Sequence, residues 1–395
     1  MFCKCTVDTT HEIAGVSNGL KQVGDKPFVG ETPQDALDSW LTPNPLFYVR
    51  SHFEYPDISN SDGLNWTISI DGGDGDVKTI TMKDLMRMPK RTMAVTMECA
   101  GNNRSDLQPK VSGNQFDSGA VSNAIWSGVS LSNVLDQVSV SPEAVEILFE
   151  GADSGVPEKG YDESSYLRSL SLNIANDPDT ILCYAMNGET LPIEHGFPLR
   201  LVVPGWYGMA SVKWVKSITA IKEPFNGYFQ GKKYVVRYQN GKEHPLTEMQ
   251  IKSFVTSHKH GESITNGQIS LSGLAWAGRA TVKSVQVSVD GGETWDNANL
   301  NGPFDTYSWQ KWSLDWIPAN LGHHTLIAKA IDSDDNEQPI ESVWNELGYA
   351  LNGLKPVCID TVSYTHHRAH ETLRYLVCRL QNEKKRGGGG GGGGG

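Results

Sequence analysis

The pattern of apolar residues changes near Glu243-His244-Pro245, and this change constrains the fold more than any other feature of the chain. Beyond it, apolar residues alternate with polar ones in short runs, as in Val285 to Val289 and Trp312 to Trp316. Another short apolar run extends from Leu326 to Ile331. Short strands separated by turn residues, with no helical periodicity, predict a β-sandwich over residues 246–361.

The preceding region, residues 46–245, mixes strand and helix patterns. Strands are predicted at Trp66 to Ile70 and at Ile181 to Met186, each followed by a glycine-containing turn. Short helices are predicted at Thr81 to Met86 and at Leu131 to Leu135, where apolar residues recur three to four positions apart. Because helices and strands mix without regular βαβ alternation, we expect an α+β domain.

Both ends of the chain have a different character. Residues 1–45 are polar and punctuated by glycine and proline, which predicts an N-terminal arm lying on the first domain. Cys3 and Cys5 alone are too few ligands for a structural zinc site. Residues 362–395 lose the strand pattern and end in the glycine run Gly387 to Gly395, so we expect a disordered tail that is not native.

Charge and hydropathy exclude several classes of protein. The formal net charge of −12 argues against a nucleic-acid binder, which needs a basic surface. No apolar run approaches 18 residues, so no membrane span is expected and the protein is predicted to be soluble. The N-terminus has no signal-peptide layout and no twin arginine, which predicts a cytoplasmic protein as the sequence stands. A leader missing from the sequence would instead imply a periplasmic or organellar protein.

The segment Thr96 to Ser105 carries the main chemical signal. Cys99 is followed by Ala100-Gly101, which lets the backbone come close to whatever the sulfur holds, and by the cation Arg104. A soft thiolate beside a guanidinium is typical of a soft metal that handles an anion. The same residues also fit a buried, inert cysteine followed by a polar turn, and the segment alone leaves both interpretations open.

Cys-Ala-Gly-Asn followed by arginine resembles the molybdenum-ligating segment of the sulfite oxidase family of molybdopterin enzymes. Further segments resemble the family in the same order: Phe47-Tyr48-Val49-Arg50-Ser51-His52, Phe149-Glu150-Gly151-Ala152-Asp153, His195-Gly196-Phe197-Pro198-Leu199-Arg200, Val203-Pro204-Gly205-Trp206-Tyr207-Gly208, Val212-Lys213-Trp214 and Trp276-Ala277-Gly278-Arg279. The resemblance implies a molybdopterin-binding catalytic domain over residues 46–245 and an immunoglobulin-like β-sandwich dimerisation domain over residues 246–361.

The resemblance also implies the site. Cys99 would be the metal ligand. The residues implied for the substrate pocket are Arg50, Arg104, Tyr234 and Arg279. Those implied for the cofactor are Tyr48, Val49, Arg50, Ser51, His52, Asp153, His195, Arg200, Ser211, Val212 and Lys213. Among them Asp153 would accept from pterin N–H groups, and Arg200 and Lys213 would face the phosphate.

A bacterial-type catalytic subunit of this family, without a haem domain, would oxidise sulfite to sulfate using a molybdenum–molybdopterin cofactor. Sulfite is a compact anion, and arginine forks match such oxyanions while keeping their charge when desolvated. The sequence contains no haem-attachment motif and no flavin fingerprint, so the electrons are expected to leave to a separate acceptor such as a cytochrome c. The family further implies a homodimer formed through the C-terminal domain.

Three positions depart from the common family pattern: Ser51 replaces an asparagine, Asn103 a second arginine and Phe116 a tryptophan. The phenylalanine removes an N–H donor from the expected pocket wall, which leaves the substrate open. Nitrate reduction and sulfoxide reduction on the same scaffold are therefore alternatives. A cofactor-free binding protein that uses its β-sandwich as an interface is an alternative from another class.

Overall fold

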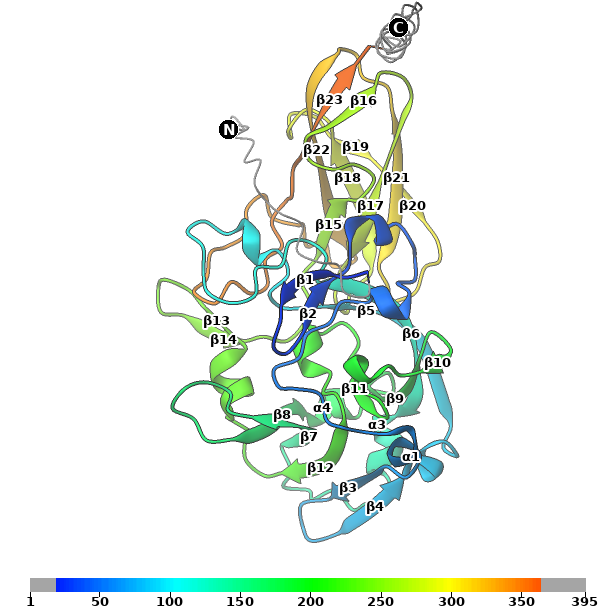
Figure 1. Ribbon diagram of the computed structural model, residues 1–395, viewed down its shortest axis with the longest axis vertical. Coiled ribbons are helices and arrows are strands. Elements are labelled where there is room, and N and C mark those ends of the chain that lie inside the picture. Colours follow the sequence, from blue (N-terminus) through cyan, green and yellow to red (C-terminus); the bar gives the residue numbers. More distant parts are fainter. Residues whose placement is uncertain (1–18, 364–395) are drawn as a thin grey trace, which may run out of the picture.

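The computed structural model describes residues 19–363 as two β-rich regions, with the C-terminal sandwich at one end of an elongated molecule (Figure 1). Cys3, Cys5 and the predicted tail from residue 364 onwards lie outside the described residues. Residues 19–45 lie along the first region, where Gly30 forms a β-bridge with Val49. The strands of this arm are β1 (Lys21–Gly24) and β2 (Val29–Glu31).

The first region contains two five-stranded sheets. One has the order β10-β9-β6-β5, with β11 also paired to β9. Its strands are β5 (Lys90–Glu98), β6 (Val121–Ser130), β9 (Ile181–Met186), β10 (Glu189–Thr190) and β11 (Arg200–Val202). The other sheet has the order β4-β3-β12-β7-β8. Its strands are β3 (Thr67–Asp71), β4 (Val77–Thr81), β7 (Glu146–Gly155), β8 (Ser164–Ser171) and β12 (Val215–Ile221).

The turns that the sequence predicted are present. β3 and β4 form a hairpin in which the Gly73 amide donates to Asp71 Oδ1 at 2.8 Å. β9 spans the predicted strand and pairs with β10 through Asn187 and Gly188, whose φ angles of 51° and 82° are left-handed. Asn and Gly are the residues that adopt this conformation at low cost, so the sequence determines the turn locally.

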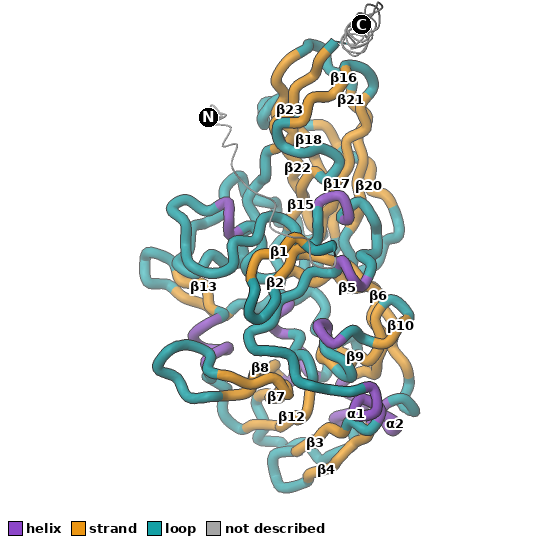
Figure 2. The backbone as a smooth tube through the Cα atoms, viewed as in Figure 1, coloured by secondary structure: helices purple, strands orange, loops and turns teal. Residues whose placement is uncertain are grey.

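Helices are few and short, so the region has less helix than the α+β prediction implies (Figure 2). The α-helices are α1 (Asn60–Leu64), α2 (Met82–Leu85), α3 (Leu131–Leu135) and α4 (Leu172–Ala175). The predicted helices correspond to α2 and α3. In α2 the Thr81 hydroxyl accepts from the Asp84 amide, and this cap stabilises a helix of a single turn. The 3-10 helices are η1 (Gln34–Ala36), η2 (Asn44–Leu46), η3 (Arg104–Asp106), η4 (Ile193–His195) and η5 (Gly208–Ala210).

The C-terminal region is a sandwich of two sheets that share one apolar core. The first sheet contains β15 (Lys252–Val255), β17 (Ile269–Trp276), β20 (Asn299–Asn301) and β21 (Gln310–Trp316). The second contains β16 (Glu262–Thr265), β18 (Val282–Ser288), β19 (Asp296–Asn297), β22 (Gly322–Asp332) and β23 (Val357–Val362). The predicted two-sheet sandwich is therefore present, and its immunoglobulin-like classification stays a prediction. Between residues 19 and 363, no helix has the length and apolar character needed to cross a lipid bilayer.

The two regions meet around the end of β5. The Glu98 carboxylate, buried in the first region, accepts from Lys252 Nζ at 2.8 Å and from Trp276 Nε1 at 2.9 Å, both from the sandwich. The segment before β23 also returns to the first region, where the Ala350 amide donates to the Ala100 carbonyl at 2.9 Å. The sandwich thus braces the loop that carries Cys99.

Candidate active site

Cys99 is the first residue after β5, at the point where the chain leaves the sheet. Its amide donates to the Ala120 carbonyl at 2.8 Å, and its carbonyl accepts from the Asn102 amide at 2.9 Å, so the loop is fixed on both sides. Burial raises the pKa of the thiol, whereas the Gly101 amide and the cations Arg50 and Arg104 lower it. Those groups favour the thiolate, which is the form that ligates a metal.

Arg104 opens η3 and is enclosed by glycines. A Cβ atom on Gly101 would lie 2.6 Å from both terminal nitrogens of Arg104, and one on Gly113 would lie 3.0 Å from its Nη1. Gly101 therefore makes room for the guanidinium, and the close approach of Ala100-Gly101 to a group held by the sulfur stays a prediction. Arg104 donates to the Leu347 carbonyl at 3.1 Å and to the Asn114 carbonyl at 2.9 Å, and its guanidinium lies over the Tyr349 ring.

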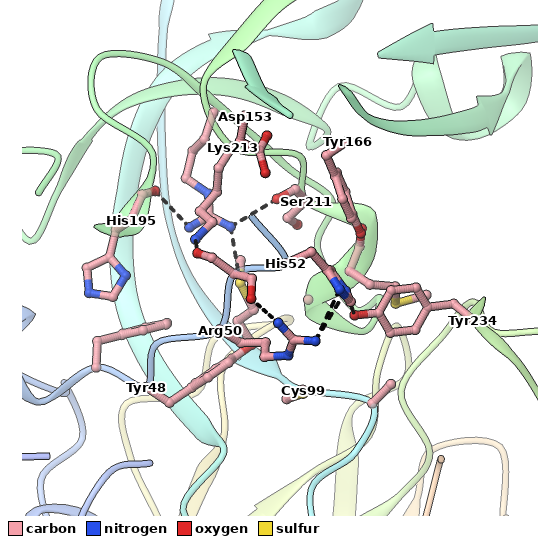
Figure 3. Close-up of a pocket in the computed structure, with 17 residues that line it drawn as sticks. Tyr48, Arg50, His52, Cys99, Asp153, Tyr166, His195, Ser211, Lys213 and Tyr234 are labelled. Carbon is pink, nitrogen blue, oxygen red and sulfur yellow. Dashed lines mark hydrogen bonds between the residues drawn. The ribbon is translucent and has the colours of Figure 1, made fainter. Parts of the chain in front are cut away.

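A first hollow lies on one side of Cys99 (Figure 3). It is lined by most of the residues expected to hold the cofactor, which come from several elements of both sheets. These residues are Tyr48, Arg50, Ser51, His52, Asp153, His195, Arg200, Ser211 and Lys213, with Tyr234. Residues 48–52 lie in the segment that follows η2, so one stretch of backbone brings four lining side chains to the hollow.

Arg200 and Lys213 carry positive charge into this hollow without a carboxylate partner. Arg200 is buried, donates to the carbonyls of His195 and Ser211 at 3.0 and 3.2 Å, and lies over the Trp126 ring. Burial lowers the pKa of Arg200 to about 10 and that of Lys213 to about 7. No carboxylate among residues 19–363 forms an ion pair with either cation. Two such cations fit an anionic group, as the phosphate of a pterin cofactor requires.

Asp153, on β7, is a buried carboxylate to which no other side chain among residues 19–363 donates a hydrogen bond. Burial raises its pKa to about 6, and the nearby Lys213 lowers it. A carboxylate without a side-chain donor in such a place fits the N–H edge of a pterin ring. His195 is also buried, its Nε2 lies 3.3 Å from the Asn44 carbonyl, and burial lowers its pKa to about 3, so the ring is neutral.

Arg50, His52 and Tyr234 form a hydrogen-bonded chain beside Cys99 (Figure 3). A guanidinium can only donate, so its contact of 3.1 Å makes His52 Nδ1 an acceptor. Burial lowers the pKa of His52 well below its ordinary value, with Arg50 adding to the effect, so the ring is neutral and carries its proton on Nε2. Nε2 then donates to the Tyr234 oxygen at 2.7 Å, which leaves the phenol hydrogen free to donate elsewhere.

A second hollow meets the first at Cys99, and the two also share Arg50 and Tyr234. The other residues that line it are Arg104, Ser112, Gly113, Asn114, Phe116, Lys233, Leu347 and Tyr349. None of the described residues that line this hollow is acidic, whereas Arg50, Arg104 and Lys233 are cationic. With a volume of about 130 Å³ the hollow has room for several water molecules or one compact oxyanion.

Three predicted residues lie elsewhere. Arg279 lines neither hollow, and its guanidinium forms an ion pair with Asp177. The structure therefore does not bring Arg279 to the substrate pocket, because a competing carboxylate holds it. Val49 and Val212 are buried, and their amides donate to the carbonyls of Gly30 and Ala210, so neither amide is free to bind a cofactor.

The sequence reasoning did not identify Tyr166, Lys233 and Tyr349. Tyr166 is on β8, stacks on the His52 ring and donates to the Met209 carbonyl at 2.8 Å. Lys233 ends the π-helix η6 (Tyr228–Lys233), next to Tyr234. The position of Lys233 next to Tyr234 could have indicated a site residue, whereas Tyr349 lies 250 positions from Cys99 and has no such neighbour in the sequence.

The departures from the family pattern have local explanations. Asn103 has φ 65°, a left-handed conformation that asparagine tolerates better than most residues, and its amide donates to Asp106 and Ser118. The Ser51 hydroxyl accepts from Lys213 Nζ. Phe116 is fully buried and forms an apolar wall of the second hollow.

Within residues 19–363, no three His, Cys, Asp or Glu side chains gather in a metal-binding group. A metal at Cys99 would therefore take its other ligands from a cofactor. The thiol, the cations without a carboxylate partner and the Asp153 carboxylate of the first hollow fit a molybdenum–molybdopterin cofactor, in which Cys99 would bind the metal and Arg200 and Lys213 would face the phosphate.

Comparison with known protein families agrees with this geometry. The family model of the oxidoreductase molybdopterin binding domain matches residues 52–229, and that of the Mo-co oxidoreductase dimerisation domain matches residues 243–361. The chain is thus a molybdopterin-dependent oxidoreductase with a molybdenum–molybdopterin cofactor. It belongs to the sulfite oxidase family, because it is 34% identical to the sulfite oxidase of Arabidopsis thaliana over 361 residues, which cover 83% of this chain and 91% of that protein.

Two further relatives define the range of similarity. The mitochondrial sulfite oxidase of Mus musculus is 33% identical over 370 residues, which cover 87% of this chain but 66% of the mouse protein. The chain thus spans just under two thirds of that relative. The crystal structure of the sulfane dehydrogenase SoxCD from Paracoccus pantotrophus matches with a TM-score of 0.72 and 29% identity, and the match covers 89% of this chain and 86% of that one.

Proposed function

We propose that this chain oxidises sulfite to sulfate and passes the electrons to a separate acceptor such as a cytochrome c. The observation that carries the proposal is the meeting of two hollows at the Cys99 sulfur, one fitted to the cofactor and one lined by cations. The sulfite oxidases among its relatives support the choice of substrate. When bound, the cofactor supplies oxo transfer and takes up two electrons.

The residues of the chain place the substrate and stabilise its charge. Arg50 and Arg104 enter the second hollow from different segments, and no carboxylate of the described chain pairs with them, so their charge is available to an oxyanion. Arg104 is held by two backbone carbonyls, so its position does not depend on the substrate. This fixed arrangement reduces the reorganisation needed when charge shifts during oxo transfer.

Tyr234 has a separate role. Because its oxygen accepts from His52, its hydroxyl proton is directed away from His52, and it is free to donate to an oxygen of the substrate. Burial raises the pKa of Tyr234 well above its ordinary value, so the phenol keeps its proton at neutral pH. The apolar walls formed by Phe116 and Leu347 limit the access of water to the same place.

The test combines composition and turnover. Purified protein is analysed for molybdenum and assayed for sulfite oxidation with ferricyanide and with cytochrome c, and for reduction of nitrate and methionine sulfoxide with reduced viologen. Arg104→Gln should raise KM for sulfite by on the order of a hundredfold, since a charge-assisted contact is lost. Arg87→Gln, at an arginine whose side chain is 67% exposed, is the matched control and should leave KM unchanged. Molybdenum-loaded protein that reduces nitrate or sulfoxide but does not oxidise sulfite would refute the proposal.

A second candidate reaction is oxidation of a sulfane sulfur, as named for the relative of known structure from Paracoccus pantotrophus. The apolar wall of Phe116 and Leu347 favours it, because a sulfane sulfur is less strongly hydrated than an oxyanion. Assays with a thiosulfonate in place of sulfite distinguish the two. If the thiosulfonate is the better substrate by kcat/KM, the sulfane reaction is the correct assignment.

We further propose that the chain forms a homodimer through the sandwich. The match of residues 243–361 to a dimerisation domain supports this. Light scattering of the purified protein should give twice the mass of the chain, and a monomer at micromolar concentration would contradict the proposal.

A further inference from the structure

The second hollow contains a third cation, Lys233, which has no role in the proposed mechanism. Lys233 lines it together with Arg50 and Arg104, close to Cys99 and Tyr234. The third cation expected from the sequence was Arg279, which pairs with Asp177 outside the hollow. The structure therefore provides three positive charges at this place, but with a lysine as the third.

The Lys233 ammonium has no ion-pair or hydrogen-bond partner among residues 19–363. It is half-buried, and within residues 19–363 no carboxylate lies within ion-pair distance of it and no hydrogen bond is formed by its side chain. Its neighbour Lys232 differs, because it forms an ion pair with Glu158 at 3.6 Å and lies over the Tyr161 ring. Two adjacent lysines thus have opposite environments, one neutralised at the surface and one free at the hollow.

The backbone that carries Lys233 is held by hydrogen bonds from two arginine side chains. The buried Arg168 donates to the Phe229 carbonyl at 2.5 Å, and Arg237 donates to the Lys232 carbonyl at 3.1 Å. Both contacts stabilise η6, a π-helix of the kind that is frequent at functional sites. The backbone at Lys233 is therefore held in place, whereas its side chain has no partner among residues 19–363 that would keep it from turning towards an anion beside the two arginines.

The electrostatics of the hollow favour the binding of an anion. Burial lowers the pKa of Lys233, and the nearby Arg50 adds to the effect, which means that the ammonium lies in a positive potential. None of the described residues that line the hollow is acidic, in a chain whose formal net charge is −12. A bound anion would offset the repulsion among the like charges at this place.

We infer that Lys233 binds the sulfur oxyanion in the second hollow and acts as a specificity-determining residue that selects doubly charged over singly charged anions. The inference rests on the proposed function for the nature of the substrate. Arg50 and Arg104 reach the anion from fixed positions, and Lys233 closes the remaining side with the third charge. Sulfite and sulfate as dianions are therefore favoured over nitrate, which has a single charge.

The test measures binding and turnover separately, with sulfate, the proposed product, as the probe. Sulfate binding to molybdenum-loaded protein is measured by calorimetry, and KM and kcat are measured with sulfite and ferricyanide. Lys233→Met should weaken sulfate binding and raise KM by about tenfold, with kcat changed less than twofold, since a partly solvated charge contact is lost. Lys233→Arg should restore most of the affinity. Lys232→Met, the matched control, removes the same charge one residue away and should change neither constant.

Molybdenum content and the thermal midpoint of each variant show whether it is folded and loaded. Sulfate affinity and KM of Lys233→Met within twofold of the unsubstituted protein would overturn the inference and leave the proposed function intact. Equal losses in Lys233→Met and Lys232→Met would also overturn it, since the effect would then be general electrostatics. Sulfate binding that depends on Lys233, in protein that does not oxidise sulfite, would support this site and refute the proposed reaction.

Discussion

The buried ion pair between Glu98 and Lys252 should make the thermal stability of the protein depend strongly on one lysine. The two charged atoms are 2.8 Å apart, and the side chains are 2% and 5% exposed. Removing one partner of a buried pair costs about 3–5 kcal/mol, because the other charge stays buried. In Lys252→Met, Glu98 keeps its donors Asn102 and Trp276, so we expect the lower end, about 3 kcal/mol.

For a domain of about 200 residues, each kcal/mol changes the thermal midpoint by roughly 2–4 °C, so the midpoint of Lys252→Met should fall by about 6–12 °C. Scanning calorimetry measures this. Because Glu98 directly precedes Cys99, the molybdenum content of the purified variant should fall as well. The double variant Glu98→Gln/Lys252→Met removes both charges and should be more stable than Lys252→Met alone.

Lys259→Met is the matched control, since Lys259 is 61% exposed and pairs with Asp35 at 2.8 Å on the surface. An exposed pair contributes about 0–1 kcal/mol, so its midpoint should change by less than about 4 °C. If Lys252→Met is as stable as Lys259→Met, or if the double variant is the least stable of the three, the reasoning about the buried pair is refuted.

Other substitutions test the site itself. Gly101→Ala should raise KM for sulfite roughly tenfold with molybdenum retained, because the new Cβ displaces the Arg104 guanidinium; an unchanged KM would show that the pocket does not need that position. Lys213→Met should lower molybdenum content at least roughly tenfold. In cofactor-free protein, Lys213→Met should have a higher thermal midpoint than the unsubstituted protein, most of all below pH 7, where Lys213 is charged although buried. Towards pH 10 the difference should shrink, because the folded lysine, with its pKa near 7, has lost the proton that the unfolded chain retains. A difference that grows with pH would contradict this. Because burial and Arg50 lower the pKa of Lys233, its ammonium loses the proton as the pH is raised, and KM should then increase. In Lys233→Arg, which keeps its charge, the increase should begin at a higher pH; superimposable pH profiles of KM would refute this.

The parts of the fold that could be predicted from the sequence are those that neighbouring residues determine. The β3–β4 and β9–β10 hairpins were predictable because Asp-Gly-Gly and Asn-Gly select their turns within a few residues. Both predicted short helices are present, and each is about one turn long because packing against the sheets limits its length.

The cofactor side of the site was predictable for a similar reason. Cys99 and residues 48–52 lie in short segments with a recognisable order, and each segment reaches the first hollow as a unit. Val49 and Val212 are exceptions within such segments, because their amides are used by neighbouring backbone. Sequence order alone does not say which backbone groups of a matching segment stay free.

By itself, the sequence determined the family and the cofactor and predicted Cys99 as the metal ligand, since those depend on residue types held close together along the chain. Only the tertiary structure decided which cations line the hollow beside Cys99. Arg279 is held by Asp177, whereas Lys233 has no competing carboxylate, and Tyr349 reaches Arg104 from the segment that returns before β23. A cation is available to an anion in a pocket only if no carboxylate lies closer, and the folded arrangement of the chain decides which carboxylates lie close.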